Sequence, residues 1–211
     1  MDRQLDLFAD VAPTTTFGNL DEARTAARAC VRCNLATTRQ QVVFGEGAAT
    51  ARLVIVGEGP SEADDASGRP FSGPSGQLLG RWLQELGLSR KEVWLTNVVR
   101  CRPTAAAGGR LRNRPPQANE LTACRPWLDA ELALLRPEAV LCVGATAGRA
   151  LIGRDFKMTR DRGQWRCAAN GTPTLATYNP AYVLRLEGDA RQRAEAEVAA
   201  DLASVRDRLR V

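Results

Sequence analysis

The sequence of 211 residues contains no histidine. Histidine is the usual general base near neutral pH and a common neutral metal ligand, so any catalysis or metal binding must use carboxylates, amides, backbone groups or thiolates. Aromatic residues make up only 5% of the chain, and lysine is scarce, so the net charge of +5 comes mainly from arginine. A surplus of arginine suits a partner that carries phosphate, although a surplus of this size also occurs in proteins that never bind nucleic acid.

Long apolar runs are also missing. No stretch approaches the roughly 20 apolar residues that a membrane span requires, and the start, MDRQLDLFADVAP, is too acidic and too weakly apolar for a secretory signal. We therefore expect a cytoplasmic protein whose cysteines do not form a disulfide scaffold. The length supports one substantial core, so we expect a disordered tail at residues 1–18 and one domain at 19–211.

Alternating apolar patterns predict an α/β fold. Strands are expected at about residues 52–56, 93–96, 138–143 and 173–177, and helices at about 20–29, 75–87, 117–135, 145–153 and 189–209. Alternation of this kind is typical of a central, mostly parallel sheet with helices on both faces. We expect that sheet to be four-stranded.

One irregular stretch, Val54–Gly76, leaves the first strand. It breaks at Gly57 and then places acidic, glycine and proline residues around one isolated aromatic residue, Phe71. Ligands of α/β sheets bind just beyond the carboxyl ends of the strands. The stretch is therefore expected to form one wall of an active site.

Four of the six cysteines have a spacing that suits a metal centre. Two form a C-x-x-C pair and two are distant in sequence, and the four are Cys30, Cys33, Cys101 and Cys124. Four thiolates in this pattern can hold either a 4Fe-4S cluster or a zinc ion. Cys142 lies in the apolar run AVLCVG and is expected in the core, whereas Cys167 has no partner at ligand spacing.

The expected tail contains the motif QLDLF. Its residues are Gln4, Leu5, Asp6, Leu7 and Phe8. The motif resembles the peptide by which many bacterial repair and replication proteins bind the polymerase sliding clamp, in which an extended segment places its apolar side chains in a pocket while the glutamine fixes the register. The alternative is the frayed start of an amphipathic helix.

A basic segment, Thr104–Pro116, follows Cys101. Its sequence, TAAAGGRLRNRPP, is hinged by two glycines. Two interpretations stay open on the residues alone: a solvated loop, or a loop that clasps a nucleic-acid strand.

Four blocks align in order with a known protein family. They are GEGPSEADD followed by GRPFSGPSGQLL, then LTNVVRCRP, then NRPPQANELTACRPWL, and finally TYNPAYVLR. Together they resemble the iron-sulfur uracil-DNA glycosylases of the family 4 type, over roughly residues 28–205. The resemblance implies a monomeric, monofunctional DNA repair enzyme, associated with the nucleoid, that hydrolyses the N-glycosidic bond of uracil flipped out of DNA. It also implies a 4Fe-4S cluster on the four cysteines selected above, with zinc as the second choice.

The resemblance implies a role for several residues of the first two blocks. Phe71 would stack on the flipped base, and the amide of Asn97 would match the O4 and N3–H edge of uracil. Glu58 is the first choice for the carboxylate that orients water and stabilises an oxocarbenium-like sugar. The remaining candidates are Glu62 and Asp64 for catalysis, and Gly57, Gly59 and Ser61 for the substrate-binding loop. At least one of these carboxylates is expected to be solvated or to cap a helix.

Two positions depart from the family pattern. The last motif of the family begins with histidine, which donates to uracil O2 as negative charge builds on the leaving base, and Asn179 stands here instead. An amide can donate one hydrogen bond but carries no charge, and losing an oxyanion donor can cost roughly a hundredfold in rate. Ser61 replaces a glycine, and its hydroxyl narrows the loop.

The basic segment is similar to the inserted loop of the X-type uracil-DNA glycosylases. In those enzymes a histidine of the loop attacks the sugar and traps the DNA covalently, and Asn113 stands at that position here. An amide is a poor nucleophile, so we expect no covalent trap. We expect phosphate or sugar contacts from the surrounding arginines, which are Arg110, Arg112, Arg114 and Arg185.

Two other functions fit these departures. The fold could serve as a low-turnover binder of uracil-bearing or abasic DNA, because Asn179 weakens the expected catalytic set. It could also release another deaminated base, such as hypoxanthine or xanthine.

Overall fold

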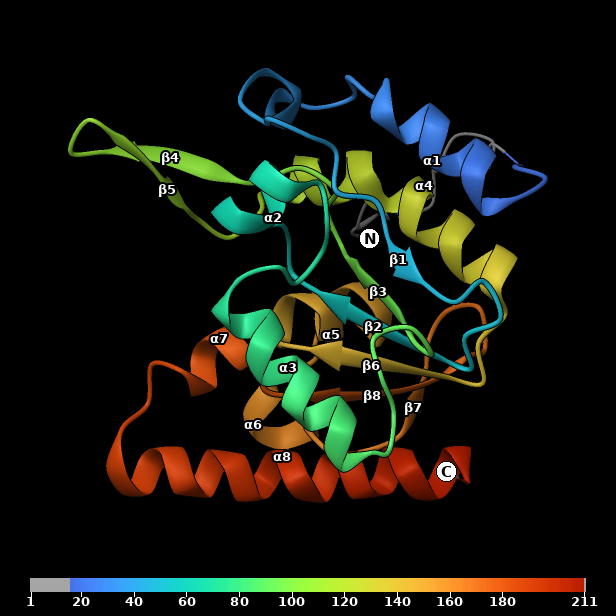
Figure 1. Cartoon of the computed structure of the whole chain (residues 1–211), viewed down its shortest axis with the longest axis vertical. Coiled ribbons are helices and arrows are strands. Elements are labelled where there is room, and N and C mark those ends of the chain that lie inside the picture. Colours follow the sequence, from blue (N-terminus) through green and yellow to red (C-terminus); the bar gives the residue numbers. More distant parts are fainter. Residues whose placement is uncertain (1–15, 211) are drawn as a thin grey trace, which may run out of the picture.

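A computed structural model of the chain describes residues 16–210. Its centre is a six-stranded sheet in the order β1-β3-β2-β6-β8-β7 (Figure 1). The four inner strands run parallel to one another and are β2 (Leu53–Gly57), β3 (Trp94–Asn97), β6 (Ala139–Val143) and β8 (Pro173–Thr177). These strands are almost entirely buried, as parallel strands covered on both faces are.

The prediction of a four-stranded sheet is wrong, because the sheet has six strands. Antiparallel strands β1 (Glu46–Gly47) and β7 (Arg166–Cys167) pair with the outer parallel strands and close both edges. Each has only two residues, and two residues cannot show an alternating pattern. The four predicted strands themselves are confirmed to within about one residue at each end.

Helices cover both faces of the sheet (Figure 1). One face packs against α1 (Leu20–Arg28), α4 (Ala118–Leu135) and α5 (Ala145–Leu151), and the other against α3 (Pro74–Glu85) and α8 (Gly188–Leu209). Successive strand side chains point to opposite faces, so Val54 and Val56 join the first core while Leu53 and Ile55 join the second. No helix within residues 16–210 has the length and apolarity to cross a membrane.

Several short elements escaped prediction because each has six residues or fewer, too few to show a helical apolar pattern. They are η1 (Asn34–Thr37), α2 (Glu62–Ser67), α6 (Met158–Asp161) and α7 (Pro180–Val183). Two of them, α2 and α7, follow β2 and β8 directly and therefore shape the region beyond the strand ends.

The basic segment forms a β-hairpin, not an irregular loop. Strand β4 (Thr104–Ala107) pairs antiparallel with β5 (Arg110–Asn113), and the hairpin extends away from the body of the molecule (Figure 1). Gly108 and Gly109 connect the strands with φ angles of 59° and 73°. Two positive φ angles in a two-residue turn suit the twist of a hairpin and favour glycine.

The N-terminal motif lies outside the described residues, so clamp binding stays a prediction. The first described residues already contact the domain. Phe17 stacks on Trp127 of α4 with ring centroids 5.8 Å apart, and the backbone N–H of Gly18 donates to Glu22. Packing thus begins before residue 19.

A buried ion pair joins α4 to the segment that follows β3. Arg100 and Glu131 have side chains 1% and 0% exposed, and Nη2 of the arginine lies 2.8 Å from Oε2 of the glutamate. The second carboxylate oxygen accepts from the backbone N–H of Gly45 at 2.9 Å, and the guanidinium also donates to the backbone oxygen of Asn97. The pair therefore ties three distant segments together inside the core.

Glu131→Ala should lower the free energy of unfolding by about 3–5 kcal/mol, because it leaves the buried Arg100 charge without its partner. Urea unfolding of the purified protein measures this loss. The matched control is Glu138→Ala, which breaks the half-exposed pair with Arg52 and should cost at most about 1 kcal/mol. Equal losses in the two variants would contradict the buried pair's role.

Candidate active site

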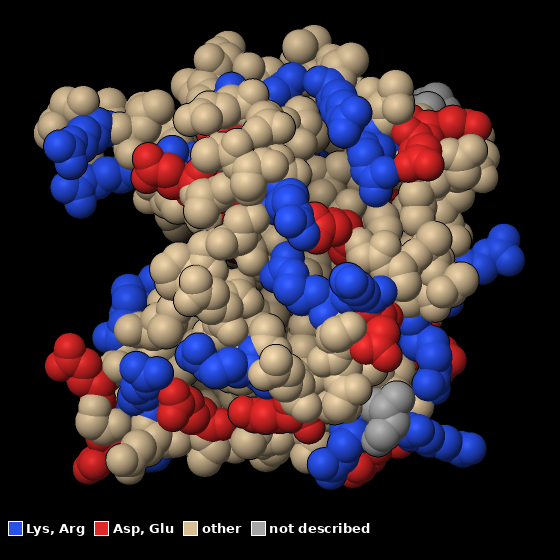
Figure 2. All heavy atoms as spheres, viewed as in Figure 1, with Lys and Arg blue, Asp and Glu red and all other residues tan. Residues whose placement is uncertain are grey.

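The parallel strands end around one cavity of about 370 Å³. Asn97 ends β3, Glu58 follows β2 and Asn179 follows β8, and all three line the cavity. Figure 2 shows a notch in the molecular outline beneath the β4–β5 hairpin, with basic side chains on the hairpin and across the notch from it. The stretch that leaves β2 contributes to the lining, as the sequence predicted.

Asn97 carries an amide that is buried and not satisfied by the protein. The residue is 3% exposed, and its Nδ2 has no hydrogen-bond partner among the described residues. Gly57 is its neighbour on β2, and a Cβ there would lie 2.4 Å from Oδ1 of Asn97 and 2.7 Å from Cζ of Phe71. Only glycine allows these two side chains to approach each other. Because a buried amide without a partner is costly, the site favours a ligand that accepts from it.

Phe71 stands beside Asn97 in a strained conformation. Its φ of 55° is rare for a residue with a bulky side chain. Arg90 holds the loop by donating to the backbone oxygens of Pro70 and Phe71 at 2.8 and 3.0 Å. Burial lowers the pKa of this guanidinium. The aromatic ring is thus fixed at the cavity wall.

Asp64 serves the local backbone. Its two oxygens accept from the backbone N–H groups of Ser72 at 2.6 Å and Ser61 at 2.9 Å. The Ser61 hydroxyl in turn accepts from the Asp64 N–H, which completes a capping box at the start of α2. Ser61 therefore begins a helix, and Asp64, although it lines the cavity, holds the loop of Phe71.

Glu62 and Gly59 occupy different surroundings. Glu62 has a side chain 77% exposed, ion-paired with Arg102 at 3.3 Å, and does not line the cavity. Gly59 does line it, and a Cβ at Gly59 would lie 2.8 Å from Cγ2 of Val99. The structure thus brings Gly59 to the site and leaves Glu62 on the outer surface of α2.

Glu58 is half-buried at the cavity wall. Its Oε2 accepts a hydrogen bond from the hydroxyl of Thr146, in the first turn of α5. Thr146 is not among the residues predicted from the sequence. Its place directly beyond an apolar strand, within VGAT, is the signal that could have found it.

Asn179 has a fixed amide orientation. Its Oδ1 accepts from the backbone N–H of Ala181 at 2.8 Å and so caps α7. The Nδ2 group is therefore the end of the amide left to donate toward the cavity. Gly144 packs against it, since a Cβ there would lie 3.1 Å from Cβ of Asn179.

The hairpin contributes one cavity residue and two exposed cations. Asn113 lines the cavity, and its Oδ1 accepts from Nε of the buried Arg102 at 2.7 Å. Arg110 and Arg112 are exposed. Arg185, which follows α7, is exposed at the cavity rim. These three arginines remain available to an anionic ligand.

Arg114 differs from the other predicted phosphate contacts. Its two Nη atoms lie 2.8 and 2.6 Å from the carboxylate of Glu120, which is 2% exposed, and its Nε donates to the backbone oxygen of Thr104. The hydrogen bonds from Arg114 hold the pKa of Glu120 below its usual range. Arg114 therefore anchors the hairpin base to α4.

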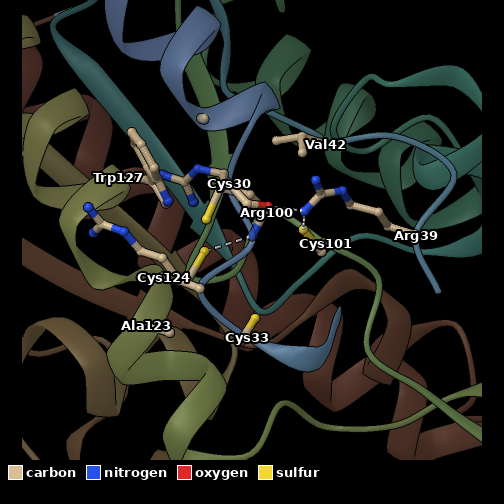
Figure 3. A pocket seen from close by; sticks show the side chains of 11 residues that line it. Cys30, Cys33, Arg39, Val42, Arg100, Cys101, Ala123, Cys124 and Trp127 are labelled. Carbon is tan, nitrogen blue, oxygen red and sulfur yellow. Dashed lines mark hydrogen bonds between the residues drawn. The ribbon is translucent and has the colours of Figure 1, made fainter. Parts of the chain in front are cut away.

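The four predicted cysteine ligands line a second, small cavity (Figure 3). They come from the α1–η1 segment, from the chain after β3 and from α4. Arg39 donates to Sγ of Cys101 at 3.4 Å, and the backbone N–H of Arg100 donates to Sγ of Cys124 at 3.2 Å. Cys142 is fully buried in the core, as predicted, and Cys167 is exposed.

Two observations test whether the cavity fits a metal group. Burial raises the pKa of the Cys124 thiol to about 12 and also raises the pKa of Cys101. Within residues 16–210, no three His, Cys, Asp or Glu side chains converge closely enough to hold one metal ion as they stand. The four thiols nevertheless line one common cavity, and a C-x-x-C pair with two further cysteines is a donor set that both iron-sulfur clusters and zinc ions use.

Comparisons with known proteins show to which family the chain belongs. The family model of the uracil DNA glycosylase superfamily matches residues 44–203. The chain is 37% identical over 165 residues to the type-4 uracil-DNA glycosylase of Thermotoga maritima, covering 78% of this chain and 82% of the relative. The enzymes of the same name from Pyrobaculum aerophilum and Sulfurisphaera tokodaii are 38% and 34% identical, covering 74% and 79% of this chain and 80% and 76% of those relatives.

These matches span the strands, the cavity loops and most of the helices described above. The chain therefore belongs to the uracil DNA glycosylase superfamily.

Proposed function

We propose that this protein removes uracil from DNA by hydrolysing the N-glycosidic bond, leaving an abasic site. The observation that carries the proposal is the buried amide of Asn97, whose Nδ2 has no protein partner beside the ring of Phe71. Uracil offers an accepting O4 and a donating N3–H, and an amide matches both at once. The relatives named above are type-4 uracil-DNA glycosylases.

The base enters the cavity by leaving the DNA stack, which costs a few kcal/mol. Phe71 replaces part of the lost stacking, and its loop is held in place by Arg90 and Asp64 before the base arrives. Asn97 then distinguishes uracil from cytosine, whose N4 amino group donates where uracil O4 accepts. Preorganisation of both side chains limits the entropy lost on binding.

Bond cleavage places positive charge on the sugar and negative charge on the base. Glu58 lies at the cavity wall where a carboxylate can orient water and stabilise the sugar. Asn179 presents Nδ2 as a neutral donor to the leaving base, because its oxygen is committed to the cap of α7. Glu62 takes no part in this scheme, since its side chain is exposed on α2.

The DNA backbone binds along the notch beneath the hairpin. Arg110 and Arg112 on β5 and Arg185 after α7 supply exposed cations on both sides of the cavity. Asn113 stays a DNA-contact candidate that cannot form a covalent trap, because its amide is a poor nucleophile.

A 4Fe-4S cluster is the group that best fits the four cysteines. Cys101 and Cys124 are buried, Cys30 and Cys33 are partly exposed, and all four line one cavity, which supports a ligand set of four thiolates. When bound, such a cluster supplies a structural cross-link between the α1–η1 segment, the chain after β3 and α4. Zinc held by all four thiolates remains the second choice.

Asn97→Ala should slow uracil release by about 100-fold or more, because the change removes the hydrogen bonds that recognise the base. Single-turnover release of free base from a uracil-containing oligonucleotide measures this, with Asn170→Ala as a control on an exposed asparagine before the amino end of β8. Asn179→His is measured alongside and should be faster than the unaltered protein.

Three results would overturn the proposed function. They are tight retention of uracil DNA without release, release of hypoxanthine or xanthine but not uracil, and full activity in Asn97→Ala. The first result would establish a protein that binds uracil-containing DNA without releasing the base. Recovery of base release in Asn179→His would then show that the loss of activity is due to Asn179.

Replacing Arg110 and Arg112 together by glutamine should weaken DNA binding most at low salt. Each phosphate contact contributes about 0.9 to the slope of log affinity against log salt concentration, so the slope should become shallower by about 1.8. Fluorescence anisotropy with an abasic-site duplex across a salt series measures it. Arg206→Gln, near the carboxyl end of α8, is the control and should leave the slope unchanged. If the slope of the double variant equals that of the unaltered protein, the hairpin is excluded from the DNA interface.

Cys124→Ser should abolish the bound iron, whereas Cys167→Ser, at an exposed cysteine, should leave it unaltered. Metal analysis should find about four iron atoms per chain in the unaltered protein, with a broad visible absorbance that is lost in the first variant. Zinc in place of iron would favour the second choice. Full iron retention in Cys124→Ser would remove Cys124 from the ligand set.

A further inference from the structure

The turn in which β6 passes into α5 is formed by Gly144 and the first two residues of the helix, Ala145 and Thr146, and it contacts two of the residues that the proposed mechanism uses. Its threonine donates a hydrogen bond to Glu58, and its glycine packs against Asn179. β6 lies between β2 and β8 in the sheet, so the turn lies between the chain segments that carry these two residues. This turn lies outside the four sequence blocks that resemble the family, and none of its residues was predicted to belong to the site.

Thr146 makes a contact that a helix does not require. A threonine in the first turns of a helix usually caps the helix or bonds to its own backbone. Here the hydroxyl reaches a carboxylate 88 residues away in sequence. It is also the one hydrogen-bond donor that residues 16–210 provide to the carboxylate oxygens of Glu58.

Gly144 allows the same turn to approach Asn179. Its φ of 113° is accessible to glycine and strained for other residues. Its backbone N–H donates to the oxygen of Thr177 at 2.9 Å, which fixes the turn to the end of β8. An added Cβ would lie 3.1 Å from Cβ and 3.3 Å from Nδ2 of Asn179.

We propose that Thr146 is a positioning residue of the glycosylase reaction, which holds Oε2 of Glu58 so that Oε1 is directed to the water or the sugar. The hydrogen bond restricts a side chain that has three rotatable bonds and is only half-buried. A carboxylate fixed by one oxygen presents the other in one orientation, and small misplacements of catalytic groups can cost 100-fold in rate. The inference rests on the proposed function, because it assigns Glu58 to the reaction.

Thr146→Val keeps the shape of the side chain and removes the hydroxyl, whereas Thr146→Ser keeps the hydroxyl. In the full-length protein, single-turnover uracil release at saturating enzyme should slow by about 10–100-fold in the valine variant and by less than about threefold in the serine variant. The enzyme concentration that gives half-maximal rate should change little in either. Thr122→Val, whose hydroxyl bonds only to its own helix at Ala118, is the matched control.

A double-mutant cycle with Glu58→Gln separates positioning from a purely structural role. If Thr146 acts through the carboxylate, Thr146→Val should add almost no further loss to Glu58→Gln. Urea unfolding of each variant shows whether the fold survives. Equal slowing by Thr146→Val in both backgrounds, or no rescue by serine, would overturn the inference.

Different results would exclude the role of Thr146 and the proposed function. Uracil release by the unaltered protein, with a large loss in Glu58→Gln and none in Thr146→Val, would remove the role of Thr146 and leave the proposed function intact. Absence of release from the unaltered protein would remove the proposed function and this inference with it.

Discussion

The buried pair of Arg100 and Glu131 is the interaction on which the rest of the structure depends. Separating two charges inside an apolar core is far costlier than keeping them together, so the pair fixes α4 relative to the end of β3. The same guanidinium donates to the backbone oxygen of Asn97, and the backbone N–H of Arg100 donates to Sγ of Cys124. Arg100 thus contacts one residue that lines the first cavity and one that lines the cysteine cavity.

The two cavities are consequently joined through six consecutive residues, 97–102. Asn97 lines the first cavity, Arg100 pairs with Glu131, Cys101 lines the cysteine cavity, and Arg102 donates a hydrogen bond to Asn113 on the hairpin. A short segment held at several points cannot move at one end without strain at the other. A metal group in the cysteine cavity would therefore support base recognition without taking part in the chemistry.

The sequence predicted the inner strands and the long helices, because apolar periodicity is a local signal. The four cysteines that it grouped as ligands line one cavity, and their role as ligands stays a prediction. The sequence did not separate Asp64 from Glu62 in function, since that depends on where α2 begins, although the S-x-x-D capping pattern at Ser61 was readable. Arg114 could not be told from its neighbours in the basic segment, because its carboxylate partner is defined by the hairpin. Thr146 was missed because its partner is distant in sequence.

The order of strands along the chain also sets the order in which the two sites can form. The fourth cysteine is residue 124, so all proposed ligands are present before β6 and β8 have been synthesised. The cavity at the strand ends, by contrast, is lined in part by Asn179, which reaches its place only when β8 pairs with β6. A chain synthesised only as far as α4 therefore contains all four cysteines and still lacks one side of the other cavity. That cavity is complete only when the whole sheet has formed.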